Sequence, residues 1–247
     1  MTKKKKTNAR ERRQGQHKAP FTCEAVGLDP TVYGAALRYL FDRPVPAKGG
    51  QEWYWDSDEP EFEATPLQWT HIQTVLFANA GADLAPYSDD QVGMGLNHVM
   101  SNNAGDIPHM VNDPSVPLAD AMRMVQALPA LWLECLGPRL EVTGEESDKH
   151  NGRLHFVSYM WFDVWPTFWN ARHIPEWQDA MWRVFCEMLA MPFRDAQMSA
   201  LHGIGHEGPR LNRPKELQTH MEAFIRSVKN DDELKTYAQA AARGMVQ

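Results

Sequence analysis

The sequence predicts an all-α protein, built either as an irregular helical bundle or as stacked antiparallel helix pairs. Apolar residues recur at helical spacing in successive segments of the chain. A proline or a capping residue stands where most of these segments begin. Apolar residues make up 43% and charged residues 23% of the 247 residues, which is typical of a globular protein and argues against wholesale disorder.

Residues 1–20 differ in composition from the rest of the chain. They carry eight basic side chains and one acid, which gives a net charge of +7. Because the whole chain has a net charge of −7, the remaining residues have a net charge of −14. Behind Met1 their apolar residues are only alanine and proline, which cannot bury enough surface to offset chain entropy. We therefore predict a disordered basic tail over residues 1–20 and a single helical domain over residues 21–247. A sub-boundary within the domain would fall near residues 143–152, which are charged and poor in apolar side chains.

The first helix is predicted from about Asp29 to Phe41, because Asp29 can cap its start and Pro30 suits its first turn. The segment Pro44–Glu63 follows as a long loop, or as a short strand around residues 53–55. A second helix begins after Thr65 and carries one apolar face.

A third helix begins after Ser88, where Gln91 completes a capping box. A fourth follows Pro117 and should be broken or kinked at Pro129. A later helix would place Trp161, Trp165 and Trp169 on one face, with a kink at Pro166. The helix that opens at Pro175 is apolar on two faces, which predicts a central position. The last three helices are predicted at about Arg194–Gly205, Pro214–Lys229 and Asp231–Met245.

The segment Asp195–His206, DAQMSALHGIGH, resembles the second half of a HEAT-like repeat. In that resemblance Ala200 and Leu201 pack between helices, and Ile204 and Gly205 permit close approach. Together with SALHGIGH, the phrases YLFDRPVP, EWYWD and SYMWFDVWP are similar to a set of uncharacterised bacterial proteins. The resemblance implies an α-solenoid of helix pairs and assigns no activity.

The acidic, aromatic segment between Glu52 and Phe62 is the candidate binding surface. Tryptophan and tyrosine are common anchors of protein interfaces, and an acidic rim speeds encounter with a cationic surface. We therefore expect a non-catalytic binding module for a basic protein partner, with an immunity- or adaptor-like role. The alternative is that these rings fold onto the core and the acids only face water. The predicted binding residues are Glu52, Trp53, Tyr54, Trp55, Asp58 and Glu59.

His202 and His206 form the candidate metal site, because residues four apart share one face of a helix. Such a pair can bind Zn²⁺ or another divalent ion, with Glu207 as a base, which would make the protein a metal-dependent hydrolase. The third ligand would come from the other histidines, of which His98, His109, His155 and His173 are candidates. The alternative is two histidines packed between helices, with no cofactor.

Asp163 lies inside an aromatic stretch, so we expect it to be desolvated unless it is partnered. A desolvated acid could serve as a proton donor. An ordinary pairing with Arg172 or Arg183 is the other expectation.

The basic tail offers weak contact with a nucleic acid or the ribosome as a third hypothesis. A solubilising tail, or one that lies on the acidic body, is the alternative. The residues that would contact phosphates are Lys3, Lys4, Lys5, Lys6, Arg10, Arg12 and Arg13.

Missing motifs argue against several other classes of protein. The three cysteines have no CxxC spacing, which argues against a disulfide framework and a zinc ribbon. No dinucleotide, P-loop, α/β-hydrolase or EF-hand motif is present. No apolar stretch approaches the ~20 residues of a membrane helix, and no secretory signal is recognisable. We therefore expect a cytoplasmic protein without a membrane partner.

Overall fold

A computed structural model describes residues 21–142 and 152–246, apart from residues 48, 57, 59 and 60. In this part of the chain the regular elements are all helical and no strand occurs, which confirms the all-α prediction. The basic tail, Glu59 and most of the proposed boundary at 143–152 lie outside the described residues. The α-helices are α2 (Cys23–Val26), α3 (Pro30–Phe41), α4 (Pro66–Asp83), α5 (Asp89–Met100), α6 (Ile107–Met110), α7 (Leu118–Leu131), α8 (Gly137–Val142), α9 (Arg153–Val164), α10 (Pro166–Ala171), α11 (Pro175–Leu189), α12 (Arg194–Glu207), α13 (Pro214–Ser227) and α14 (Asp232–Ala241).

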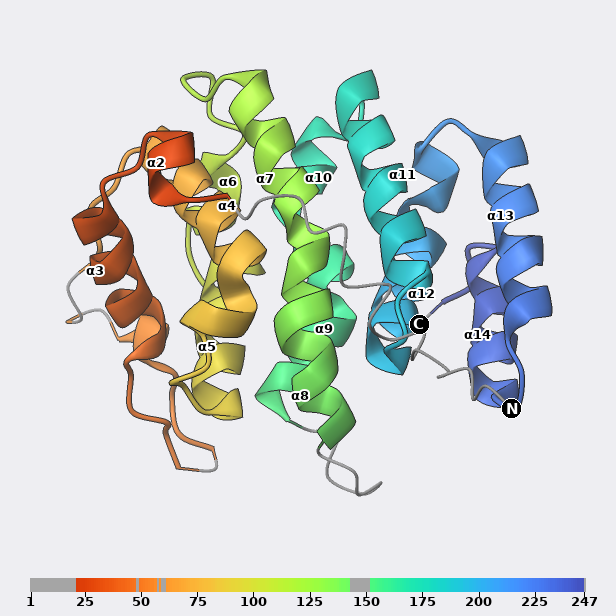
Figure 1. The fold of residues 1–247 in the computed structure, drawn as a ribbon, viewed down its shortest axis with the longest axis horizontal. Helices are drawn as coiled ribbons and strands as arrows, with labels where there is room; N and C mark the ends of the chain where they lie inside the picture. The colour runs from red at the N-terminus through yellow and green to blue at the C-terminus, as the bar shows by residue number, and fades with distance from the viewer. Residues whose placement is uncertain (1–20, 48, 57, 59–60, 143–151, 247) are drawn as a thin grey trace, which may run out of the picture.

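The helices follow one another along the long axis of the molecule, from α2 and α3 at one end to α13 and α14 at the other (Figure 1). Two series of contacting helices run along this axis. In one, α4 packs on α7 and α7 packs on α11. In the other, α3, α5, α9, α12 and α14 contact each other in succession. A HEAT-like repeat stays a prediction. No helix among the described residues has the length and apolar character that crossing a membrane requires.

Local capping explains why the first long helices begin where the sequence predicts. The Asp29 carboxylate accepts a hydrogen bond from the backbone N–H of Thr31 at the start of α3. At the start of α4, the Thr65 hydroxyl accepts from the Gln68 backbone N–H, and the Gln68 side chain accepts from the Thr65 N–H. Ser88 and Gln91 form the same reciprocal pair at α5. Each cap satisfies backbone donors that the helix itself leaves free.

At Pro129 the predicted break does not occur, and at Pro166 the structure differs from the predicted kink. Pro129 does not end α7, which continues to Leu131 and runs through a π-helical turn at Trp132–Leu136 into α8. Pro166 separates two helices instead of kinking one, because Trp165 before it is extended and α10 starts at the proline itself. The tryptophans at 161, 165 and 169 therefore do not share one continuous helix.

Of the two alternatives for the segment Pro44–Glu63, the described residues agree with the long loop, and the short strand at residues 53–55 is wrong. Residues Trp53–Trp55 form a single 3-10 turn, in which the Trp55 N–H donates to the Glu52 carbonyl. An isolated strand here would have no neighbour to pair with, because the structure contains no strand among the described residues. A turn instead satisfies its backbone groups locally.

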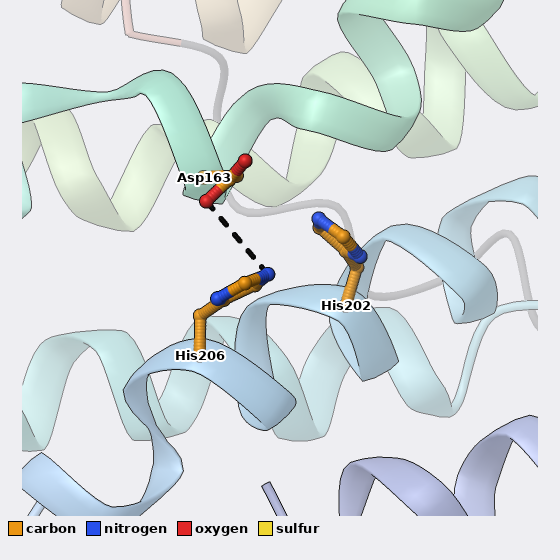
Figure 2. Close-up of side chains that lie close together, drawn as sticks. All are labelled: Asp163, His202 and His206. Carbon is orange, nitrogen blue, oxygen red and sulfur yellow. Dashed lines mark ion pairs between the residues drawn. The ribbon is translucent and has the colours of Figure 1, made fainter. Parts of the chain in front are cut away.

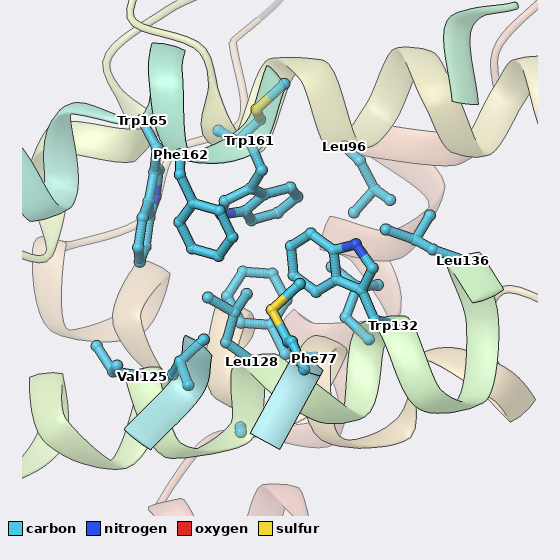
Figure 3. Packing of buried hydrophobic residues seen from close by; sticks show 14 of the residues in the cluster. Phe77, Leu96, Val125, Leu128, Trp132, Leu136, Trp161, Phe162 and Trp165 are labelled. Carbon is cyan, nitrogen blue, oxygen red and sulfur yellow. The ribbon is translucent and has the colours of Figure 1, made fainter. Parts of the chain in front are cut away.

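The core is continuous along the molecule and rich in aromatic side chains. Trp161 of α9 packs edge-to-face against Trp132 and Phe77, with ring centroids 5.2 and 5.6 Å apart (Figure 3). Helix α11 is buried on both faces, as its sequence predicts, with Trp177 and Phe185 among its buried residues. This packing holds α9 and α12 against each other.

Gly93 lies at a close approach of α5 to the start of α9. A Cβ atom at this position would lie 2.7 Å from the Arg153 Cβ and 2.8 Å from the Leu154 backbone N, closer than packed atoms approach. We expect Gly93→Ala to lower the free energy of unfolding by about 1–3 kcal/mol, because the backbone of α9 must move. Gly34→Ala is the matched control, since its Cβ would meet only the end of Arg38 and should stabilise α3. Urea unfolding checks both, and equal stability of the two variants would contradict the packing described here.

Candidate functional site

A cavity of about 590 Å³ opens among the elements of the N-terminal half, between α3, α4, α5, α6 and the turn at Trp53–Trp55. Its aromatic walls form a connected series in which each ring contacts the next, with centroids 4.9–5.6 Å apart. In the order of these contacts the rings are Trp69, Phe62, Tyr39, Trp53, Tyr54 and Trp55. The volume lies in the range of pockets that bind small molecules or side chains.

The rim of this aromatic pocket is acidic. Asp56, Glu61 and Asp106 line the cavity and are exposed, whereas no lysine or arginine is among the described residues that line it. Arg43 lies next to the pocket, with its guanidinium 4.5 Å from the Trp53 ring centroid and 5.1 Å from that of Tyr39. The arrangement therefore combines π faces, which attract cations, with carboxylates that carry the complementary charge.

His98 of α5 forms part of the pocket wall. Its ring stacks on Tyr54 at 5.2 Å and meets Trp53 edge-to-face at 4.8 Å. Its Nδ1 lies 2.7 Å from the Ala104 carbonyl oxygen. Burial lowers the pKa of His98 to about 4, so the ring is neutral near pH 7. Gly105 adopts φ of 153° beside it, and a Cβ there would lie 2.8 Å from the His98 Cε1.

The residues of the predicted binding segment separate into different roles. Trp53 is buried at 9% exposure, Tyr54 is partly buried with its hydroxyl accepting from the Asn97 amide, and Trp55 is 50% exposed. The Glu52 carboxylate forms an ion pair with Arg153 at 2.7 Å and does not line the cavity. Asp58 is exposed but does not line the cavity. The acidic rim is formed by other carboxylates of the segment, and by Asp106.

A second constellation lies between α9 and α12. Asp163, His202 and His206 each place one potential ligand atom within 4.8 Å of the others (Figure 2). The Nε2 of His206 lies 3.7 Å from the Asp163 Oδ1, and the two imidazole rings meet edge-to-face at 4.6 Å. Asp163 and His206 are about one-third exposed, at 35% and 34% of their side-chain surface, whereas His202 is buried at 1%.

Two tyrosines hold the His202 ring in place. The Nδ1 of His202 lies 2.7 Å from the Tyr237 hydroxyl of α14, which lies 2.6 Å from the Tyr159 hydroxyl of α9. Tyr159 also packs against the imidazole, with centroids 4.3 Å apart. Burial, followed by the neighbouring His206, lowers the pKa of His202 to about 4, so it is neutral near pH 7. Burial, together with the Tyr159 hydrogen bond, raises the pKa of Tyr237.

The third member of this cluster is not one of the expected histidines. His98 lies in the aromatic pocket, His109 lies near Asn170, His155 lies 3.9 Å from Asp195, and His173 is exposed. These four are therefore outside the cluster, and the carboxylate of Asp163 stands in their place.

Asp163 and Glu207 also have partners other than those predicted. Asp163 pairs with His206, while Arg172 instead pairs with Glu207 at 3.5 Å. Glu207 is buried, and its carboxylate lies between Arg172 and Arg210. Burial raises the pKa of Glu207, and the two arginines oppose that shift. Glu207 is thus oriented by arginines and does not belong to the Asp–His–His cluster.

Comparison of the chain with protein-family models, with curated proteins and with solved structures finds no match. A function must therefore be inferred from the aromatic pocket and from the Asp163–His202–His206 cluster.

Proposed function

We propose that the protein is a binding module that takes a cationic side chain of a basic protein partner into the aromatic pocket. The observation that carries the proposal is the cavity of about 590 Å³ with aromatic walls and an acidic rim. Tryptophan faces are the strongest π partners of ammonium and guanidinium groups, and each contact contributes about 0.5–2 kcal/mol. Arginine is the favoured cation, because its planar guanidinium stacks on rings and also pairs with carboxylates.

Arg43 provides an example within the chain of a guanidinium packed against these rings. Its guanidinium already lies over two rings of the wall, within the distance at which cation–π attraction acts. Trp55, at 50% exposure, leaves ring surface for a second cation at the mouth of the pocket. Asp56 and Glu61 would then provide both long-range attraction and a direct ion pair.

Calorimetric titration with two synthetic peptides tests the proposal. One peptide alternates arginine with glycine, and the other replaces each arginine with glutamate. We expect the arginine peptide to bind and the glutamate peptide to show no heat of binding. The affinity should fall as salt increases, since the rim carboxylates are exposed and screened. Equal binding of both peptides, or no binding of the arginine peptide at millimolar concentration, would refute the proposal.

Substitutions at the pocket separate the aromatic contribution from the charge contribution. We expect Trp55→Ala to weaken binding of the arginine peptide by roughly 5–30-fold, the equivalent of one strong cation–π contact. Phe156→Ala is its matched control, because Phe156 is also an exposed aromatic but does not line the pocket. Calorimetry with the same peptide measures both, and equal affinities for the two variants would remove Trp55 from the site.

The double variant Asp56→Asn/Glu61→Gln removes two carboxylate charges from the rim and should weaken binding of the arginine peptide. The loss should be largest at low salt, so the affinity of this variant should depend less on salt than that of the wild type. The control neutralises two exposed acids elsewhere, Glu187→Gln on α11 and Glu222→Gln on α13, and thus changes the net charge by the same amount. An equal loss of affinity in both double variants would show that net charge, and not the pocket, attracts the peptide.

A further inference from the structure

The Asp163–His202–His206 cluster contains two imidazole nitrogens that the protein does not satisfy. The Nε2 atoms of His202 and His206 are both buried and have no hydrogen-bond partner among the described residues. Most buried polar atoms are partnered, and leaving one unpartnered costs about 1–3 kcal/mol. Figure 2 shows both rings turned towards the Asp163 carboxylate. A single ligand bound between the three side chains would satisfy both nitrogens.

The hydrogen bond at the Nδ1 of His202 leaves only its Nε2 available to bind a ligand in the cluster. Its Nδ1 is occupied by the Tyr237 hydroxyl, and Tyr237 is in turn bonded to Tyr159. When Nδ1–H donates to Tyr237, Nε2 carries a lone pair that faces the cluster. Metal-binding histidines are commonly oriented in this way, by a hydrogen bond from the nitrogen that does not touch the ion.

We propose that Asp163, His202 and His206 bind a divalent first-row transition metal, with Zn²⁺ the best-matched ion. Two imidazoles and one carboxylate suit such ions, whereas Ca²⁺ and Mg²⁺ prefer oxygen ligands alone and Cu⁺ prefers sulfur. Zinc binds nitrogen and carboxylate oxygen at about 2.0–2.2 Å, so the three ligand atoms must close by roughly 1 Å. Asp163 and His206 are each partly exposed and can make this movement.

A site with three protein ligands leaves at least one coordination position for water or another ligand. In this site that position faces the solvent side, since the exposed surface of the cluster belongs to Asp163 and His206 and not to His202. The site lies on α9 and α12, whereas the aromatic pocket is built by α3–α6, so it is a second site, independent of the proposed peptide binding.

The test uses the full chain, purified without a histidine tag and stripped of metal with a chelator. Zn²⁺ is then titrated into the protein in competition with a chromophoric zinc chelator, which reports the affinity. We expect one Zn²⁺ per chain. Asp163→Asn and His206→Gln each remove a direct ligand and should lower the affinity by more than the roughly 10- to 100-fold that loss of an outer-shell partner costs. These two variants change partly exposed side chains, so they should retain the fold, which circular dichroism verifies. His173→Gln is the control for adventitious binding, because His173 is exposed and lies outside the cluster.

Tyr237→Phe tests the role of the Tyr237 hydroxyl, which bonds to the Nδ1 of His202. It leaves all three ligands in place and should lower the Zn²⁺ affinity about 10- to 100-fold without changing the stoichiometry. Co²⁺ provides an independent readout, because its visible absorption should appear with the wild-type chain and be lost in Asp163→Asn. No stoichiometric binding of Zn²⁺, or equal binding by wild type, Asp163→Asn and His206→Gln, would overturn the proposal and leave the cluster as an ion pair between packed helices.

Discussion

Trp161→Ala should lower the free energy of unfolding by about 3–5 kcal/mol, the usual cost of removing a buried tryptophan. Trp161 is fully buried and touches Trp132, Phe77 and Trp165, three rings that come from different helices or their connections. Removing it leaves a cavity that these large, interlocked rings cannot close by small movements. The edge-to-face pairs with Trp132 and Phe77 are lost in addition to the buried area.

Urea unfolding and thermal unfolding both measure this effect. A loss of this size should lower the melting temperature by on the order of 10 °C in a chain of this length. Trp55→Ala is the control within the same residue type, since Trp55 is half-exposed and should change stability by less than about 1 kcal/mol. A similar, small effect of both substitutions would contradict the packing in Figure 3.

The stability of the protein should fall by up to about 3 kcal/mol between pH 6.5 and pH 4 because of His98 alone. Burial first, and the charge of Arg43 in addition, lower its pKa from 6.5 to about 4, and the hydrogen bond to Ala104 only partly opposes them. The unfolded chain therefore binds a proton in this pH window that the folded chain does not. Stability contributed by the neutral ring is complete above pH 6.5 and is lost as the pH falls through the window.

The His98→Gln variant isolates this effect from the carboxylates and from His202, which also change protonation in acid. Urea unfolding of wild type and variant at pH 7 and pH 4.5 gives two differences in free energy. We expect the difference to be smaller in the variant, because one group that takes up a proton on unfolding has been removed. Identical pH dependence in both proteins would contradict the buried, neutral state of His98.

Local signals in the sequence were sufficient to predict where the helices α3, α4 and α5 begin. Asp29, Thr65 and Ser88 each bond to backbone groups within three residues, so the pattern that predicts them is the interaction that forms them. The two internal prolines show where such signals fail. Pro129 and Pro166 both interrupt apolar segments, yet one lies inside a helix and the other starts one. The residue before Pro166 is extended, whereas the residue before Pro129 is helical.

The candidate sites were predictable only in part, for a related reason. The sequence identifies Trp53, Tyr54 and Trp55 as a group because they are neighbours, but Trp69 and His98 join them through the packing of α4 and α5. The histidine pair on α12 was likewise visible in its spacing, while its acidic partner lies on α9. The one signal for that partner was an isolated aspartate within an aromatic stretch, and it did not reveal which residue the carboxylate would face.

The most direct test of the proposed function is a nuclear magnetic resonance titration of the tryptophan indole N–H groups with the arginine peptide. The chain has nine tryptophans, and their signals can be assigned by single Trp→Phe variants. Three of them line the pocket, namely Trp53, Trp55 and Trp69, whereas Trp132, Trp161, Trp165 and Trp177 lie in the core. We expect the pocket signals to shift in proportion to the bound fraction while the core signals stay in place. Unmoved pocket signals at saturating peptide, or shifts confined to other tryptophans, would contradict the claim that this pocket receives a cationic side chain.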